Sequence, residues 1–131
     1  MIYDFVSKSL INEISHWADK SSLSVRDRAA FDQRLFLLGS IDRELALDTK
    51  LLNGPLRKAG NLYKMKITAD KQLQPHLCTG PSNHSFEYTL LSGAIERDGK
   101  LNPSNVQDQS CARRELVKEH PNERREHHKT L

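Results

Sequence analysis

The spacing of apolar residues changes near Leu62, and this change does most to limit the folds open to the chain. Before Leu62, apolar residues recur three or four positions apart, as on one face of a helix. From Leu62 onward, Tyr63, Met65 and Ile67 alternate with polar residues, as in a half-buried strand. The sequence therefore predicts an α+β fold, in which an N-terminal helical hairpin packs on a small antiparallel sheet of three to four strands and a C-terminal helix follows.

Two helices form the predicted hairpin. The first covers residues 8–19, with Ser9 as its N-cap. The second begins after Ser24, which forms a capping-box pattern with Asp27, and Gly39 ends it. The segment MIYDFV before the hairpin is either a short strand or the start of the first helix, because so short a segment does not define a period.

Two further helices are predicted from weaker patterns. A short one lies within residues 40–60 and directs three leucines inward: Leu45, Leu51 and Leu52. The last helix covers residues 105–118, with Ser104 as its cap and Pro121 as its stop.

The predicted sheet lies between these helices. Its first strand starts at Leu62, and the second, QLQPHLCT, carries Pro75, which cannot donate to a ladder and so predicts an edge or a bulge. The most apolar run, FEYTLLSGAIE, is expected in the centre of the sheet. The following segment DGKLNPSN is predicted to be a loop.

The length of 131 residues fits one domain, which we place at residues 1–118. The remaining residues, 119–131, are highly charged and have little to bury, so a partly mobile tail is predicted. The net charge of +3, from 20 Lys and Arg against 17 Asp and Glu, favours anionic partners only weakly.

Three features occur together in this chain: two N-terminal helices, a first main strand LYKMKI and an arginine-rich C-terminal helix. With the segments GNLYKMKI and YTLLSGAIERDGKL, this pattern resembles the RelE/HigB/ParE toxin superfamily over roughly residues 2–118, and within it the phage-derived, Gp49-like or HigB-like proteins. The resemblance implies a RelE-like fold for the domain 1–118. It also implies the toxin of a type II toxin–antitoxin pair, an endoribonuclease that cuts messenger RNA on the ribosome without a metal.

In such cleavage the 2′-hydroxyl of the RNA attacks the adjacent phosphate, which requires a base, an acid and cations around the phosphorane charge. The resemblance implies catalytic groups at Lys64, Lys66, His76, Glu96 and Arg97. It implies further contacts to RNA from Lys71, Gln74, Lys100, Arg113 and Arg114. The period of two independently places Lys64 and Lys66 on one face of their strand.

The chain departs from the family pattern in two ways. Gln74 and His76 stand where many RNase members carry an arginine on the second strand, and no tyrosine follows the central strand. A second function therefore stays open, that of a non-catalytic RelE-fold binding protein such as a phage-encoded inhibitor of a host enzyme, with ParE-like inhibition of DNA gyrase as a minor branch. On that interpretation Lys64 and Lys66 only keep an exposed strand face soluble.

The expected partners are a cognate antitoxin protein and ribosome-bound messenger RNA, and no cofactor is expected. No metal is expected, because His76, Cys78 and His84 lack the recurrent spacing of a zinc site. A cytoplasmic location is expected, because the two cysteines form no disulfide framework and no apolar run approaches the roughly 18 residues that span a bilayer.

Overall fold

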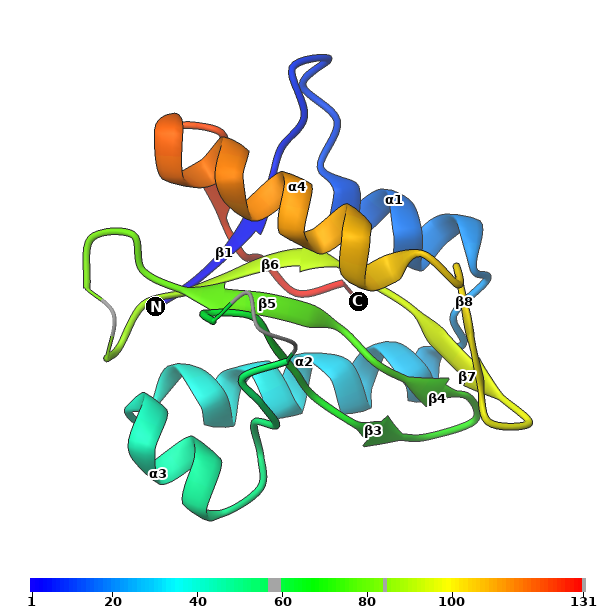
Figure 1. The fold of residues 1–131 in the computed structure, drawn as a ribbon. Helices are drawn as coiled ribbons and strands as arrows, with labels where there is room; N and C mark the ends of the chain where they lie inside the picture. The colour runs from blue at the N-terminus through cyan, green and yellow to red at the C-terminus, as the bar shows by residue number, and fades with distance from the viewer. Residues whose placement is uncertain (57–59, 84, 131) are drawn as a thin grey trace.

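The computed structural model describes residues 1–56, 60–83 and 85–130, which form an α+β fold (Figure 1). Its helices are α1 (Glu13–Lys20), α2 (Val25–Gly39), α3 (Arg43–Asp48) and α4 (Val106–Glu119). Its strands are β1 (Ile2–Phe5), β2 (Tyr63–Lys64), β3 (Ile67–Thr68), β4 (Gln72–Leu73), β5 (His76–Thr79), β6 (Tyr88–Ser92), β7 (Ile95–Arg97), β8 (Lys100–Asn102) and β9 (Arg124–Glu126). None of the described helices is both long and apolar enough to cross a bilayer.

The strands form two sheets, where the sequence predicted one sheet of three to four strands. The larger sheet has the order β2-β5-β6-β1-β9, and the smaller has the order β3-β4-β7-β8. All pairs are antiparallel except β1 and β6, which run parallel. The strand β6 lies at the centre of the larger sheet, as predicted for the most apolar run. The predicted loop after it contains β8, because Asp98 and Gly99 turn the chain back on β7 with positive φ angles.

Helices cover the larger sheet from two sides. In Figure 1, α1 and α4 lie on one side of β6, whereas α2 and α3 lie on the other. The main core joins Ile14 and Ala18 of α1 to Phe31, Leu35 and the strand residues beneath them. A smaller core lies under α4 and contains Phe5, Leu62, Cys78, Leu91 and Val117. Both faces of the central strands are therefore buried.

The two helices predicted for the N-terminal hairpin are present, but they follow the strand β1 and lie on different sides of β6, and the first starts later than expected. Helix α1 begins at Glu13 because the Asn12 side chain accepts hydrogen bonds from the backbone of Ile14 and Ser15. Leu10 has a φ of 63°, which a continuous helix excludes, so the predicted start at residue 8 is wrong. The capping box at the start of α2 and its end at Gly39 are confirmed.

The two other helices are confirmed with changed details. The short third helix is α3, capped by Asp42, and its Leu45 is exposed, not inward. Residues 57–59 of the segment in which it was predicted lie outside the described residues. Helix α4 agrees with the last predicted helix, but its N-cap is Asn105, with no side-chain cap bond, in place of Ser104.

The C-terminal segment contributes to the sheet. Sequence charge predicted a partly mobile tail over residues 119–131, yet residues 124–126 form β9, which pairs with β1. The backbone N–H of His127 donates to the carbonyl of Ile2, and Val6 donates to Glu123, so the pairing extends beyond the strand itself. The charge of this segment did not reveal the strand, because its partners are backbone groups of β1 and buried carboxylates.

Candidate functional site

Three neighbouring extended segments are each interrupted by two residues that belong to no strand, between β2 and β3, β4 and β5, and β6 and β7. The predicted catalytic residues lie around these interruptions, which together form a break across the sheet. The breaks fall at Met65 and Lys66, at Gln74 and Pro75, and at Gly93 and Ala94. They are side by side, because Met65 donates to the carbonyl of Pro75 and Gln74 donates to that of Ala94. Pro75 has no N–H to return a bond, so the predicted irregularity is a break across the sheet, and not an edge strand.

Lys64, Lys66 and Glu96 share one side of the sheet at this break. Tyr63, Met65 and Ile67 are buried, whereas Lys64 and Lys66 between them are half-buried and exposed. Burial lowers the pKa of Lys64, the charge of Lys66 lowers it further and the charge of Glu96 raises it. Both charged groups therefore lie within electrostatic reach of the Lys64 ammonium.

His76 pairs directly with Lys64 across the strands but is closed to solvent. The residue is 0% exposed, and its Nδ1 lies 3.0 Å from the carbonyl oxygen of Gln74. Burial and the charge of Lys64 lower the pKa of His76, against the bond to Gln74 that raises it. Its Nε2 is buried without a hydrogen-bond partner. His76 therefore lies beside Lys64 on the same side of the sheet, but its ring is closed to solvent.

Gln74 is also buried, where the sequence predicted a contact to RNA. Gln74 is only 3% exposed, and its Oε1 has no hydrogen-bond partner.

Cys78, which was considered as a metal ligand, is buried on β5. Burial raises the pKa of its thiol to about 12. Cys78 is therefore not a thiolate at neutral pH, and His84, considered with it above, lies outside the described residues.

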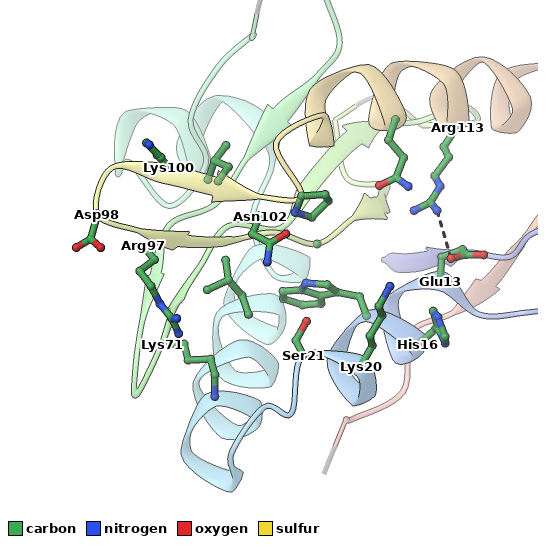
Figure 2. A pocket seen from close by; sticks show the side chains of 16 residues that line it. Glu13, His16, Lys20, Ser21, Lys71, Arg97, Asp98, Lys100, Asn102 and Arg113 are labelled. Atoms are coloured by element: carbon green, nitrogen blue, oxygen red, sulfur yellow. Dashed lines mark hydrogen bonds and ion pairs between the residues drawn. The ribbon is translucent and has the colours of Figure 1, made fainter.

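Three predicted cations lie on the other side of the β7–β8 hairpin. Successive residues of a strand point to opposite faces, so Arg97 faces away from Glu96. Arg97 pairs with Lys100 in the hairpin, and both line a cavity of about 620 Å³ together with Lys71 (Figure 2). The structure thus divides the predicted site into an open lysine face and a cavity.

Arg113 and Arg114 have structural contacts in place of a free position for RNA. Arg113 donates to the carbonyl oxygen of Leu91 at 2.8 Å and to Glu13 at 3.2 Å, and its guanidinium lies 5.3 Å from the centre of the Phe5 ring. Burial lowers the pKa of Arg113, and Glu13 raises it. Arg114 donates to the carbonyl of Gly60 and contacts Glu115. These bonds tie α4 to the sheet and to α1.

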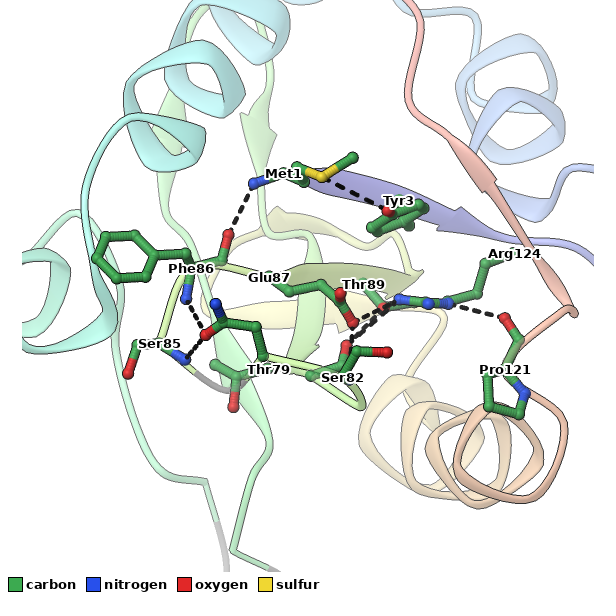
Figure 3. A network of polar contacts seen from close by, with 12 residues as sticks. Met1, Tyr3, Thr79, Ser82, Ser85, Phe86, Glu87, Thr89, Pro121 and Arg124 are labelled. Atoms are coloured by element: carbon green, nitrogen blue, oxygen red, sulfur yellow. Dashed lines mark hydrogen bonds and ion pairs between the residues drawn. The ribbon is translucent and has the colours of Figure 1, made fainter.

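A buried ionic network near the chain ends was missed from the sequence (Figure 3). Arg124 contacts Glu87 at 2.9 Å, and their side chains are 9% and 10% exposed. The Arg124 guanidinium also lies 4.2 Å from the centre of the Tyr3 ring. The available signal was Glu87, a charged residue inside the most apolar run of the chain.

The open lysine face combines two ammonium groups with a carboxylate, which is a set of groups suited to a phosphodiester and its proton transfers. The cavity combines cations with an aromatic ring and amides. Comparisons with protein-family models, with curated proteins and with solved structures find no match to this chain.

Proposed function

We propose that this protein is the toxin of a type II toxin–antitoxin pair and that it cleaves ribosome-bound messenger RNA without a metal. A RelE-like arrangement of the fold and a cognate antitoxin in the cytoplasm belong to the same proposal. The observation that carries it is the grouping of Lys64, Lys66 and Glu96 on one side of the sheet break, with the pKa of Lys64 lowered by burial and by Lys66.

In the proposed reaction, Glu96 accepts the proton of the 2′-hydroxyl as its oxygen attacks the phosphorus. Lys66 stabilises the negative charge of the phosphorane. Lys64 gives a proton to the 5′-oxygen as the P–O5′ bond breaks, because a lowered pKa makes its ammonium a better acid. The products are a 2′,3′-cyclic phosphate and a free 5′-hydroxyl.

Inducible expression with mapping of new 5′ ends in cellular messages tests this proposal. Expression is expected to stop growth and to create new ends. The double variant Lys64→Ala/Lys66→Ala is expected to lower the cleavage rate by about 10² or more, since electrostatic stabilisation of a transition state is worth several kcal/mol. The control Lys8→Ala/Lys118→Ala removes equal charge from exposed positions elsewhere and is expected to cleave normally. Undiminished cleavage by a folded Lys64/Lys66 variant would contradict the proposal.

A non-catalytic binding function is the second candidate, and the burial of His76 favours it. A ring that is 0% exposed cannot exchange a proton with a substrate, which removes one acid–base group from the site. A pull-down from a host lysate separates the two functions. A toxin of the proposed kind retains ribosomes and message, whereas an inhibitor retains one host protein in stoichiometric amount.

A further inference from the structure

A cavity lies between α1 and the β7–β8 hairpin. Its volume of about 620 Å³ lies within the range of about 300–1,000 Å³ that small-molecule sites occupy. Figure 2 shows that Lys20 and Ser21 reach it from α1, whereas Arg97 and Asn102 reach it from the hairpin. Lys100 of the same hairpin also lines the cavity. The helix α1 and the hairpin therefore form two of its walls, and α4 contributes Gln109 and Arg113.

The walls of the cavity carry more positive than negative charge. The cations are Lys20, Lys71, Arg97, Lys100 and Arg113, and the carboxylates are Glu13 and Asp98. Glu13 is paired with Arg113, and Lys71 is paired with Asp27 outside the cavity. Lys20, Arg97 and Lys100 form no ion pair with any residue that the structure describes. These three cations are free to bind an anion, and Arg97 has the planar donors that suit a phosphate group.

The aromatic group of the cavity is Trp17. Its ring lies at a tilt to Phe31, with 5.8 Å between the ring centres, and it also packs against Gly93. A Cβ atom at position 93 would overlap the indole, so glycine is required for this close approach. The ring remains only partly buried. Asn102 and Gln109 add amide groups, which donate and accept hydrogen bonds, to the same cavity.

We propose that this cavity binds a nucleotide, with its phosphate on Arg97 and Lys100 and its base against Trp17. Stacking of a base on an aromatic side chain is worth about 1–3 kcal/mol, and amides supply partners for the edge of a base. The nucleotide in the cavity is not the one cleaved at the lysine face, because Glu96 and Arg97 lie on opposite sides of β7. The proposal therefore stands independently of the proposed nuclease activity.

The fluorescence of the protein tests this proposal directly, because Trp17 is the only tryptophan of the chain. The full chain is titrated with AMP, with adenosine and with inorganic phosphate. Saturable quenching by AMP is expected, with a Kd at least about tenfold lower than that of either fragment, because charge-assisted hydrogen bonds and stacking then act together. The absence of saturable quenching by AMP, or equal binding of AMP and phosphate, would overturn the proposal.

Two double variants locate the binding site. Arg97→Ala/Lys100→Ala changes exposed residues and is expected to raise the Kd for AMP about tenfold or more. Lys64→Ala/Lys66→Ala, on the other side of the sheet, is expected to leave this Kd unchanged. The reverse pattern would place the nucleotide at the lysine face and would refute the cavity as its site, whatever the outcome of the cleavage assay.

A free nucleotide and a nucleotide within RNA share this chemistry, and a third arm distinguishes them. A short uncleavable oligoribonucleotide with 2′-O-methyl groups competes with AMP for the quenching of Trp17. Tighter binding of the oligonucleotide than of AMP would identify an RNA residue as the ligand, and weaker binding would identify a free nucleotide. Either result supports a nucleotide site in the cavity.

Discussion

At the scale of single residues, the ion pair of Arg124 with Glu87 is almost fully buried. Besides Glu87, the guanidinium donates to Thr89 Oγ1 at 3.3 Å and, through Nε, to the carbonyl of Pro121 at 2.9 Å (Figure 3). A buried ion pair of this kind gives little net stability over an apolar pair, but removal of one partner leaves an uncompensated charge. The cost of breaking it is therefore large.

The variant Arg124→Leu is expected to lower the free energy of unfolding by about 3 kcal/mol or more, because the Glu87 carboxylate is left buried without its cation. Urea denaturation measures this difference. The control Arg125→Leu changes an exposed neighbour and is expected to cost less than about 0.5 kcal/mol. The double variant Arg124→Leu/Glu87→Leu should recover part of the loss, and equal losses in the single and double variants would show that the ion pair is not the cause.

The burial of single side chains was predictable from the sequence only where it depends on local spacing. The alternation of Lys64 and Lys66 with Met65 was predictable, because the side-chain period of a strand is local. The burial of His76 was not, because a helix some thirty residues further along the chain covers the second face of β5. The resemblance implied a catalytic role for His76, and no local pattern shows that α4 packs on its strand.

At the scale of elements, His127 anchors the C-terminal strand to the rest of the molecule. Its Nδ1 lies 2.8 Å from Asp4 of β1, and its Nε2 lies 3.6 Å from Asp32 of α2. The Phe31 ring packs edge-on against the imidazole. Burial lowers the pKa of His127, but the hydrogen bond that its ring donates to Asp4 and the charges of Asp4 and Asp32 raise it more, so the net shift is upward.

This raised pKa makes the attachment of β9 depend on pH. The charged imidazole stabilises the folded state fully below pH about 6.5, and this stabilisation is lost as the pH rises through the higher folded pKa. The protection of the His127 amide, which donates to Ile2, is expected to fall across that range by at most about tenfold per pH unit. Hydrogen exchange, corrected for intrinsic rates, measures it. His127→Gln should abolish the dependence and the exposed control His128→Gln should keep it, so a dependence unaffected by His127→Gln would refute this role.

The elements also separate into those that local sequence defines and those that it does not. Helix α2 was predicted with its cap and end because Ser24, Asp27 and Gly39 lie next to the backbone groups that they serve. The pairing of β1 with β6 joins Ile2 to Tyr88, and no local pattern specifies such a partner. The proposed nuclease residues Lys64 and Glu96 come together for the same non-local reason. The strand β2, which carries Lys64, continues into β3, and both β3 and β7, which carries Glu96, pair with β4.

At the scale of the whole molecule, both ends of the chain lie in one sheet. The strand β1 is held between β6, which it meets in parallel, and β9, which it meets in antiparallel orientation. Beyond β9, Thr130 donates to the carboxylate of Asp32 through its backbone N–H and its hydroxyl. The segment after α4 thus supplies partners to three buried or nearly buried carboxylates: Asp4, Asp32 and Glu87.

Deletion of residues 120–131 is therefore expected to destabilise the whole domain, although the charge pattern predicted a partly mobile tail over residues 119–131. The deletion removes Arg124 and His127 together and exposes the edge of β1, so the free energy of unfolding should fall by about 4 kcal/mol or more, out of the 5–15 kcal/mol typical of a domain. Urea denaturation of the shortened chain measures this, with Arg125→Ser/His128→Gln as the control that changes only exposed tail residues. If the deletion cost no more than that control, the contacts of the C-terminal segment with β1 would not contribute to the stability of the domain.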